Sequence, residues 1–117
     1  MLLNISTSAL LKHLVLYQFK ANVSTEIVNE TNNRMLSLKE GCLTPTKQPY
    51  IRDLTGGKEM SIEGASQNLQ YAFTVEFASV EDRNYYVNND SYHHAFKAYA
   101  IPYLENFVIV DYVEGAF

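Results

Sequence analysis

The chain has 117 residues, of which 47% are hydrophobic and 19% charged, and its formal net charge is −4. This length suits one domain with one core, and an acidic chain without a basic patch argues against nucleic acid as a partner. The apolar runs are shorter than the roughly 18–20 residues of a membrane span, so no membrane partner is expected. The single cysteine, Cys42, excludes an internal disulfide and fits a reducing compartment, which predicts a cytoplasmic protein.

Residues 13–20 are rich in β-branched, aromatic and aliphatic side chains and contain no breaker, which predicts a strand. Successive side chains of a strand point to opposite faces. One face is therefore aromatic with an imidazole at its end, and it consists of His13, Val15, Tyr17 and Phe19. The other face becomes polar towards Lys20, so the two faces are expected to have different neighbours.

The next residues predict a helix and a short strand. Ser24 is a suitable helix cap, and Gly41 is a suitable helix end. Two prolines mark residues 42–49 as a loop, and residues 50–54 have the composition of a short strand. Gly56-Gly57-Lys58 resembles part of a phosphate-binding loop but lacks its full spacing, so a turn is expected there.

The second half of the chain begins with a polar connection, residues 59–68, in which one helical turn near Ile62 is possible. Clear alternation follows, and Ser79 then resembles a helix cap with an acid three residues later. Pro102 is expected at a kink or restart before the last element. The expected elements are a strand at 69–77, a helix at 79–87, a helix at 91–100 and a strand at 107–113.

With the helices at 79–87 and 91–100 counted as one helical segment, this order is β-α-β-β-α-β, which predicts an α+β fold, a ferredoxin-like antiparallel four-stranded sheet with helices on one face. The strands also have a second apolar side, which a partner copy could cover, so a homodimer is expected. We expect residues 1–12 to be an N-terminal extension, residues 13–113 the domain, and residues 114–117 a C-terminal tail.

Titratable and aromatic side chains are concentrated in residues 85–96. A histidine can act as a general base at neutral pH, and a tyrosine hydroxyl can donate a hydrogen bond to a developing negative charge. Asp90 stands three residues before His93 and either caps the helix or orients the imidazole. His94 is about a hundred degrees further round the helix and is expected at the surface.

Five segments, in this order and spacing, resemble the stress-responsive dimeric α/β-barrel (Dabb) family across nearly the whole chain. They are His13–Lys20, Gly57-Lys58, Phe73–Ser79, Asp90–Phe96, and Pro102–Leu104 with Val110–Tyr112. The resemblance implies a homodimer of ferredoxin-like subunits whose sheets form a barrel. Fold alone does not confer an activity.

Within this family, the chain resembles the olivetolic acid cyclase-like polyketide cyclases, which close a linear poly-β-ketone without cofactor or metal. It implies His93 as general base or acid, Tyr86 as hydrogen-bond donor and His13 as a further catalytic residue. The spacing from Tyr86 to Asp90 is one residue longer than in that group, so Tyr85 competes with Tyr86 for the tyrosine role. The substrate-binding residues expected from the aromatic strand faces and the resemblance are Val15, Tyr17, Tyr71, Phe73, Val75, Phe96 and Ile109.

The leading hypothesis is therefore a cofactor-independent cyclase or related lyase acting on a polyketide-like or aromatic small molecule. A non-catalytic stress-related or ligand-binding dimer is one alternative, and a cofactor-free monooxygenase is another. A metal site built from His13, His93 and Asp90 has no recognised ligand spacing, so no metal is expected.

Overall fold

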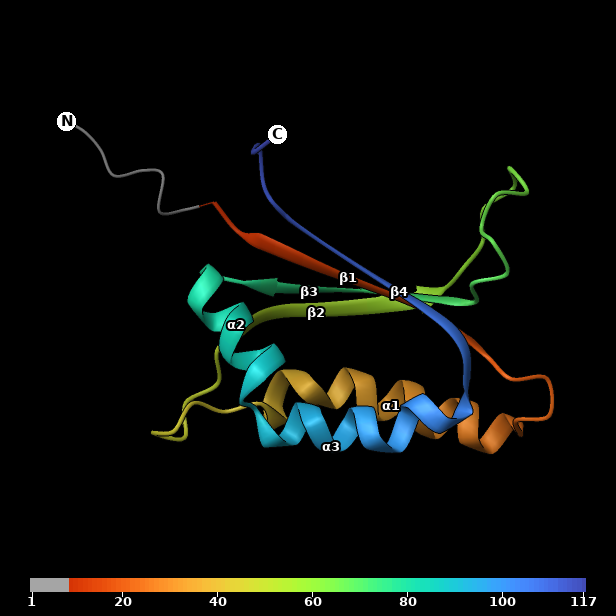
Figure 1. Cartoon of the computed structure of the whole chain (residues 1–117), viewed down its shortest axis with the longest axis horizontal. Coiled ribbons are helices and arrows are strands. Elements are labelled where there is room, and N and C mark those ends of the chain that lie inside the picture. The colour runs from red at the N-terminus through yellow and green to blue at the C-terminus, as the bar shows by residue number, and fades with distance from the viewer. Residues whose placement is uncertain (1–8) are drawn as a thin grey trace.

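The computed structural model describes residues 9–117, which form one four-stranded sheet with helices on one side (Figure 1). The sheet has the order β2-β3-β1-β4, and every neighbouring pair is antiparallel. This architecture confirms the predicted ferredoxin-like α+β class. Its elements are β1 (Leu11–Phe19), α1 (Thr25–Gly41), β2 (Ile51–Lys58), β3 (Tyr71–Phe77), α2 (Val80–Asn88), α3 (Ser91–Ala100), the 3-10 helix η2 (Ile101–Tyr103) and β4 (Leu104–Val113).

Local side-chain chemistry fixes where the three α-helices begin. Ser24 accepts a hydrogen bond from the backbone of Ile27, and Ser79 accepts one from Asp82, so each satisfies an amide of a first turn. Asp90 caps α3 in the same way but is buried, with 2% of its surface exposed. Within residues 9–117, no helix combines the length and the apolar character that crossing a bilayer requires.

The strand β2 is longer than the sequence predicted, because the expected turn at Gly56-Gly57-Lys58 is part of it. These residues pair with Phe73, Ala72 and Tyr71 of β3. A Cβ atom at Gly56 would lie 2.1 Å from Cδ2 of Phe73, so the absence of a side chain lets that ring cover the strand. The expected helical turn near Ile62 does not form, and residues 59–70 make an irregular arm that projects from the sheet in Figure 1.

The strands β1 and β4 also begin earlier than expected, at Leu11 and Leu104. Their hydrogen-bonded pairing runs from Leu11 opposite Val113 to Phe19 opposite Leu104, with one irregularity near Gln18. Backbone pairing, which composition does not reveal, thus extends both strands. The boundary expected at residue 12 lies inside β1, and residues 1–8 of the predicted extension lie outside the described residues.

The two faces of the sheet have different environments. The helices cover the face that carries His13, Tyr17 and Phe77, where the core lies (Figure 1). None of the helices in residues 9–117 covers the opposite face, where Val108, Val110 and Tyr112 of β4 keep 38%, 50% and 49% of their surface exposed. The described part of the chain therefore leaves the second apolar side of the sheet uncovered.

Candidate functional site

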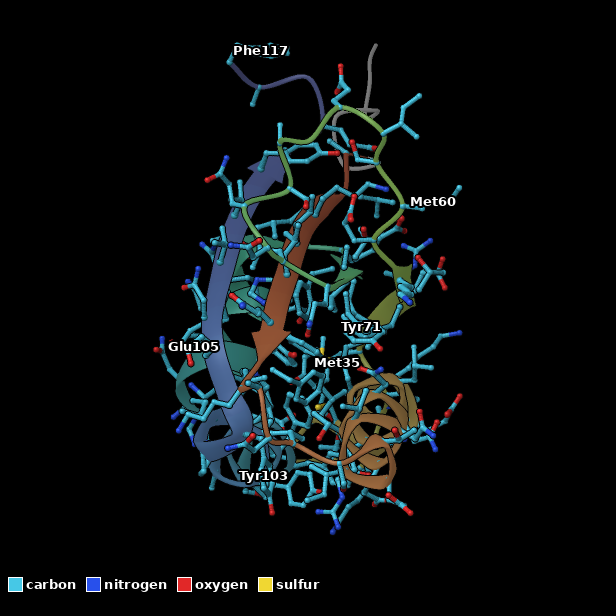
Figure 2. The ribbon with its side chains drawn as sticks, turned by 90° about the vertical axis from the view of Figure 1, so that its right-hand side faces the viewer. Met35, Met60, Tyr71, Tyr103, Glu105 and Phe117 are labelled. Carbon is cyan, nitrogen blue, oxygen red and sulfur yellow. The ribbon has the colours of Figure 1, made fainter. Side chains whose placement is uncertain are left out.

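A small apolar cavity of about 50 Å³ lies between the sheet and the helices, under β1 and the edge strand β4. Met35, at its α1 side, lies between the strands and that helix in Figure 2. The remaining lining comes from β1, β4, α2, α3 and η2. The full lining consists of His13, Val15, Tyr17, Met35, Tyr86, His93, Phe96, Lys97, Ala100, Ile101, Leu104, Phe107 and Ile109.

The His93 imidazole is held by two contacts with Tyr86. Its Nδ1 lies 2.9 Å from the backbone carbonyl oxygen of Tyr86, and its ring stacks on the Tyr86 ring with centroids 3.7 Å apart and 16° between the planes. Asp90 sets the start of α3, because its Oδ1 accepts hydrogen bonds from the amides of Tyr92 and His93. The Asp90 carboxylate therefore positions the His93 backbone, and a carbonyl orients the ring.

The His13 imidazole is part of a charged chain of contacts. Its Nδ1 lies 2.7 Å from Oδ1 of Asp111, and Nη1 of Arg83 lies 2.6 Å from Oδ2 of the same carboxylate. His13 and Asp111 face each other across the β1–β4 pair, so strand register brings the two side chains together. The ring of His13 also makes an edge contact with Tyr86, at 5.5 Å between centroids.

These contacts determine which ring nitrogens carry hydrogen. A backbone carbonyl and an ionised carboxylate can only accept, so Nδ1 of both histidines is the donor in the neutral form. Within residues 9–117, Nε2 of neither histidine has a protein partner, and no fully buried side-chain nitrogen or oxygen lacks one. Both Nε2 atoms therefore reach open space, each as an unprotonated acceptor beside the cavity that both rings line.

Burial decides the protonation states of the site. Removal from water lowers the pKa of His93 to about 4, and the positive charge of Lys97 adds to that effect. Burial also lowers the pKa of His13, while Asp111 opposes the change and Arg83 adds to it. Burial raises the pKa of Tyr86 above its usual value, so its hydroxyl stays protonated as a donor. At neutral pH the site thus has two neutral imidazoles and one phenol.

A larger recess of about 400 Å³ adjoins the cavity on the outside. His13, His93, Lys97 and Ile109 line both spaces, so the two imidazoles stand where the spaces meet. The inner cavity is mostly apolar, whereas the recess adds charged and polar side chains. The members found only in the recess are Arg83, Asn84, Val87, Asn88 and Asp111.

A family model described as "Stress responsive A/B Barrel Domain" matches residues 11–114. The chain belongs to the Dabb family. A search of the curated proteins found no match. The solved structures therefore supply the remaining comparisons for this Dabb chain.

Three solved structures illustrate how closely this Dabb fold is shared. Hydroxynitrile lyase from Passiflora edulis has a TM-score of 0.81 at 17% identity, covering 94% of this chain and 98% of its own. A protein from Arabidopsis thaliana has a TM-score of 0.78 at 25% identity, covering 92% and 97%. A protein from Bacteroides fragilis, described as dimeric, of unknown function and ferredoxin-like, has a TM-score of 0.60 at 26% identity, covering 89% and 95%. At 17% identity, the likeness to the lyase shows the fold alone.

The Dabb structure brings together the three predicted catalytic residues, His13, Tyr86 and His93, on one cavity. Four of the predicted binding residues line it too, namely Val15, Tyr17, Phe96 and Ile109. Three do not, namely Tyr71, Phe73 and Val75. These lie on β3, on the other side of β1 from β4, where Phe73 and Val75 are core and Tyr71 packs against Tyr17.

The structure also decides between the alternatives in residues 85–96. Tyr86 faces the cavity, whereas the hydroxyl of Tyr85 donates to the carbonyl of Leu43. Asp90 caps α3 and does not bond to the His93 ring, so the capping interpretation is confirmed. His94 is exposed as predicted, and its Nε2 bonds the carbonyl oxygen of Val87.

Sequence reasoning missed several lining residues, of which Lys97 and Phe107 are the most informative. Lys97 and Ala100 follow His93 by four and seven positions, the spacing of one helix face. Phe107 precedes Ile109 by two positions, the spacing of one strand face. Both spacings are visible in the sequence. They identify lining residues only once β4 is known to lie next to β1.

Proposed function

We propose that this chain is a cofactor-independent lyase or cyclase that acts on a polyketide-like or aromatic small molecule with a carbonyl group. One observation carries the proposal. Two neutral imidazoles with open Nε2 atoms and one protonated tyrosine line a single, mostly apolar cavity. A relative of the same fold, from Passiflora edulis, is named a hydroxynitrile lyase, and this name supports lyase chemistry.

The proposed reaction is an intramolecular aldol closure. An imidazole Nε2 removes a proton from the carbon between two carbonyl groups, and the Tyr86 hydroxyl donates a hydrogen bond to the resulting enolate oxygen. The enolate carbon attacks a second carbonyl of the same molecule and forms the new carbon–carbon bond. The imidazolium then returns its proton to the new alkoxide, so the enzyme finishes in its starting state.

The two imidazoles have different roles in this proposal. Asp111 would stabilise a proton on His13 through a charge-assisted hydrogen bond, whereas the His93 ring donates to an uncharged backbone carbonyl. We therefore assign the general base to His13. His93 accepts a hydrogen bond from the substrate. This assignment reverses the order that the sequence resemblance implied, in which His93 was the base.

A second candidate, a ligand-binding dimer without catalysis, is favoured by the size of the inner cavity. At about 50 Å³ it is smaller than the roughly 150 Å³ that encloses a benzene ring. A linear poly-β-ketone would need both the cavity and the recess of about 400 Å³. A ligand seated only in the recess would meet the two imidazoles without being enclosed.

We further propose that two copies associate through the uncovered face of the sheet. The exposed side chains of Val108, Val110 and Tyr112 supply apolar surface there. The Bacteroides fragilis relative, 26% identical, is described as dimeric. Two sheets packed face to face would bury these side chains and leave the cavity, on the helical face, open to substrate.

Turnover by site variants tests the catalytic proposal. Candidate 1,3-dicarbonyl chains and cyanohydrins are supplied without cofactor to the wild type and to His13→Gln, His93→Gln and Tyr86→Phe. We expect His13→Gln to lower kcat about 10²–10⁴-fold, the usual contribution of a general base, and Tyr86→Phe about 10²-fold or more. His93→Gln should mainly raise KM.

His94→Gln is the matched control, because His94 is on the same helix but exposed. It should keep the wild-type rate. Equal rates for the wild type and His13→Gln would remove His13 as the base. A larger loss of kcat in His93→Gln would return that role to His93. Unchanged substrates with measurable binding would favour the ligand-binding dimer.

A further inference from the structure

The outer recess is positively charged, although the chain as a whole has a net charge of −4. Its charged lining consists of Arg83, Lys97 and Asp111, that is, two cations and one carboxylate. The two histidines that also line it are neutral at neutral pH because burial lowers the pKa of both. The recess therefore has an excess of one positive charge directly outside an apolar cavity.

Lys97 forms no ion pair within the described part of the chain. The one carboxylate of the recess within residues 9–117, Asp111, is held by His13 and Arg83. Lys97 is half-buried and lines both the recess and the inner cavity. A lysine in this position can bury its aliphatic stem against the apolar lining and keep its ammonium in the recess, where the charge is available to an anionic ligand.

Arg83, the other cation of the recess, keeps free donors. A guanidinium has five N–H groups, and among the described residues Arg83 donates one hydrogen bond to Asp111 and one to Asn84. Its remaining N–H groups can therefore bind an oxygen in the recess. Arg83 comes from α2 and Lys97 from α3, so the two cations border the recess from different helices.

The arrangement of the recess and the inner cavity indicates how an anionic ligand would lie relative to the two imidazoles. An anionic group near Lys97 would leave the rest of a short molecule pointing into the apolar cavity past Phe96 and Phe107. The atoms next to the anionic group would lie at the junction, which Lys97, His13 and His93 all line. A carboxylate a few bonds from a reacting carbon therefore fits the arrangement.

We propose that Lys97 is a specificity-determining residue that binds the carboxylate of a short acid with an apolar far end, with Arg83 as the second cation. The inference rests on the proposed function for its chemical meaning, since it makes the substrate a small keto acid. The single excess charge of the recess matches one carboxylate. Asp111 disfavours a more highly charged anion at the same place.

Binding of a matched ligand pair tests this inference without any turnover. Hexanoate and hexanamide have the same chain and differ in charge, and their binding is followed by NMR through the ring signals of His13 and His93. We expect the wild type to bind hexanoate at least about fivefold more tightly than hexanamide, as a partly solvated charge-assisted contact predicts. Lys97→Met should abolish that preference and Lys97→Arg should retain it.

Lys58→Met is the matched control for net charge, because Lys58 is exposed on β2, the opposite edge strand from β4. It should keep the fivefold preference. Cooperative denaturant unfolding of ligand-free Lys97→Met establishes that this variant keeps its fold. Equal binding of the two ligands by the wild type, or an undiminished preference in Lys97→Met, would overturn the inference. A retained preference in a chain without turnover would leave it standing and count against the proposed function alone.

Discussion

At the scale of single residues, His13 and His93 are two buried imidazoles with different supports. Each donates from Nδ1, one to a carboxylate and the other to a carbonyl. A carboxylate stabilises the protonated ring and a carbonyl does so far less, so one fold holds two histidines of unequal basicity a few ångströms from one cavity. The stacking of His93 on Tyr86 adds a geometric constraint, because the ring cannot turn without losing that contact.

The low pKa of His93 makes the stability of the fold depend on pH. The pKa of this imidazole is 6.5 in the unfolded chain, and burial lowers it to about 4 in the folded chain. Above pH 6.5 the ring is neutral in both the folded and the unfolded chain, so burying it does not lower the free energy of unfolding. As the pH falls from 6.5 to 4, the unfolded chain gains a proton that the folded chain does not. The free energy of unfolding should then drop by up to about 3 kcal/mol.

Denaturant unfolding between pH 7 and pH 4.5 measures this effect. His93→Phe keeps a ring that can stack on Tyr86 but cannot titrate, so its stability should fall less steeply with pH than that of the wild type. His94→Gln removes an exposed histidine and should leave the wild-type slope unchanged. An identical slope in the wild type and His93→Phe would show that His93 is not the group responsible.

At the scale of elements, the start of α3 depends on one buried cap. Asp90 accepts two backbone amides through Oδ1, and its Oδ2 accepts the hydroxyl of Tyr50 at 2.5 Å. The thiol of Cys42 is also buried beside this carboxylate, and burial raises its pKa, which argues against a nucleophilic role. This cap places His93 one turn into the helix, above Tyr86.

Removing this buried cap should cost more than removing the half-buried cap of α2. Asp90→Ala loses the cap and leaves the buried Tyr50 hydroxyl without an acceptor, so the free energy of unfolding should fall by about 2–4 kcal/mol. Ser79→Ala, which removes the cap of α2, should cost about 1 kcal/mol. Chemical denaturation of both variants measures the difference. Equal losses would mean that the Tyr50 contact adds nothing.

The sequence predicts local features of these elements, such as helix caps, better than it predicts which strands lie next to one another in the sheet. Ser24, Ser79 and Asp90 were recognisable as caps because their side chains act within three residues. Alternation grouped Phe73 and Val75 on one apolar face of their own strand, and both are buried in the structure. It could not show that β3 and β4 flank β1 on opposite sides, so it could not exclude Phe73 from the cavity. The sequence predicts a turn at Gly56, whereas in the structure Gly56 pairs with Phe73, whose ring lies where a side chain would be. This contact joins residues distant in sequence, so local composition does not reveal it.

At the scale of the whole molecule, the sheet separates two tasks. Its helical face holds the cavity with both imidazoles, and its bare face presents apolar side chains of β4 (Figure 1). A charge placed on the bare face should therefore change association without touching the site. Only the register of β4 against β1 assigns its side chains to one face or the other.

Val110→Lys should weaken or abolish the proposed dimer, because a buried lysine without a partner would oppose the packing of two sheets. Light scattering after gel filtration should show a monomer, and the wild type should show a dimer. Leu36→Lys, at a residue 43% exposed on α1, is the control and should stay dimeric. A wild type that is monomeric at micromolar concentration would contradict the proposal.

The edge position of β4 has a consequence beyond the pairing of two folded subunits. This strand is ten residues long, its outer edge has no neighbouring strand within the described chain, and most of its side chains are exposed on both faces. Long, apolar edge strands are templates for uncontrolled strand addition and aggregation. Variants that prevent association should therefore be less soluble than the wild type even where their fold is intact. Selection for colloidal stability, separate from any chemistry, would then help to keep β4 covered.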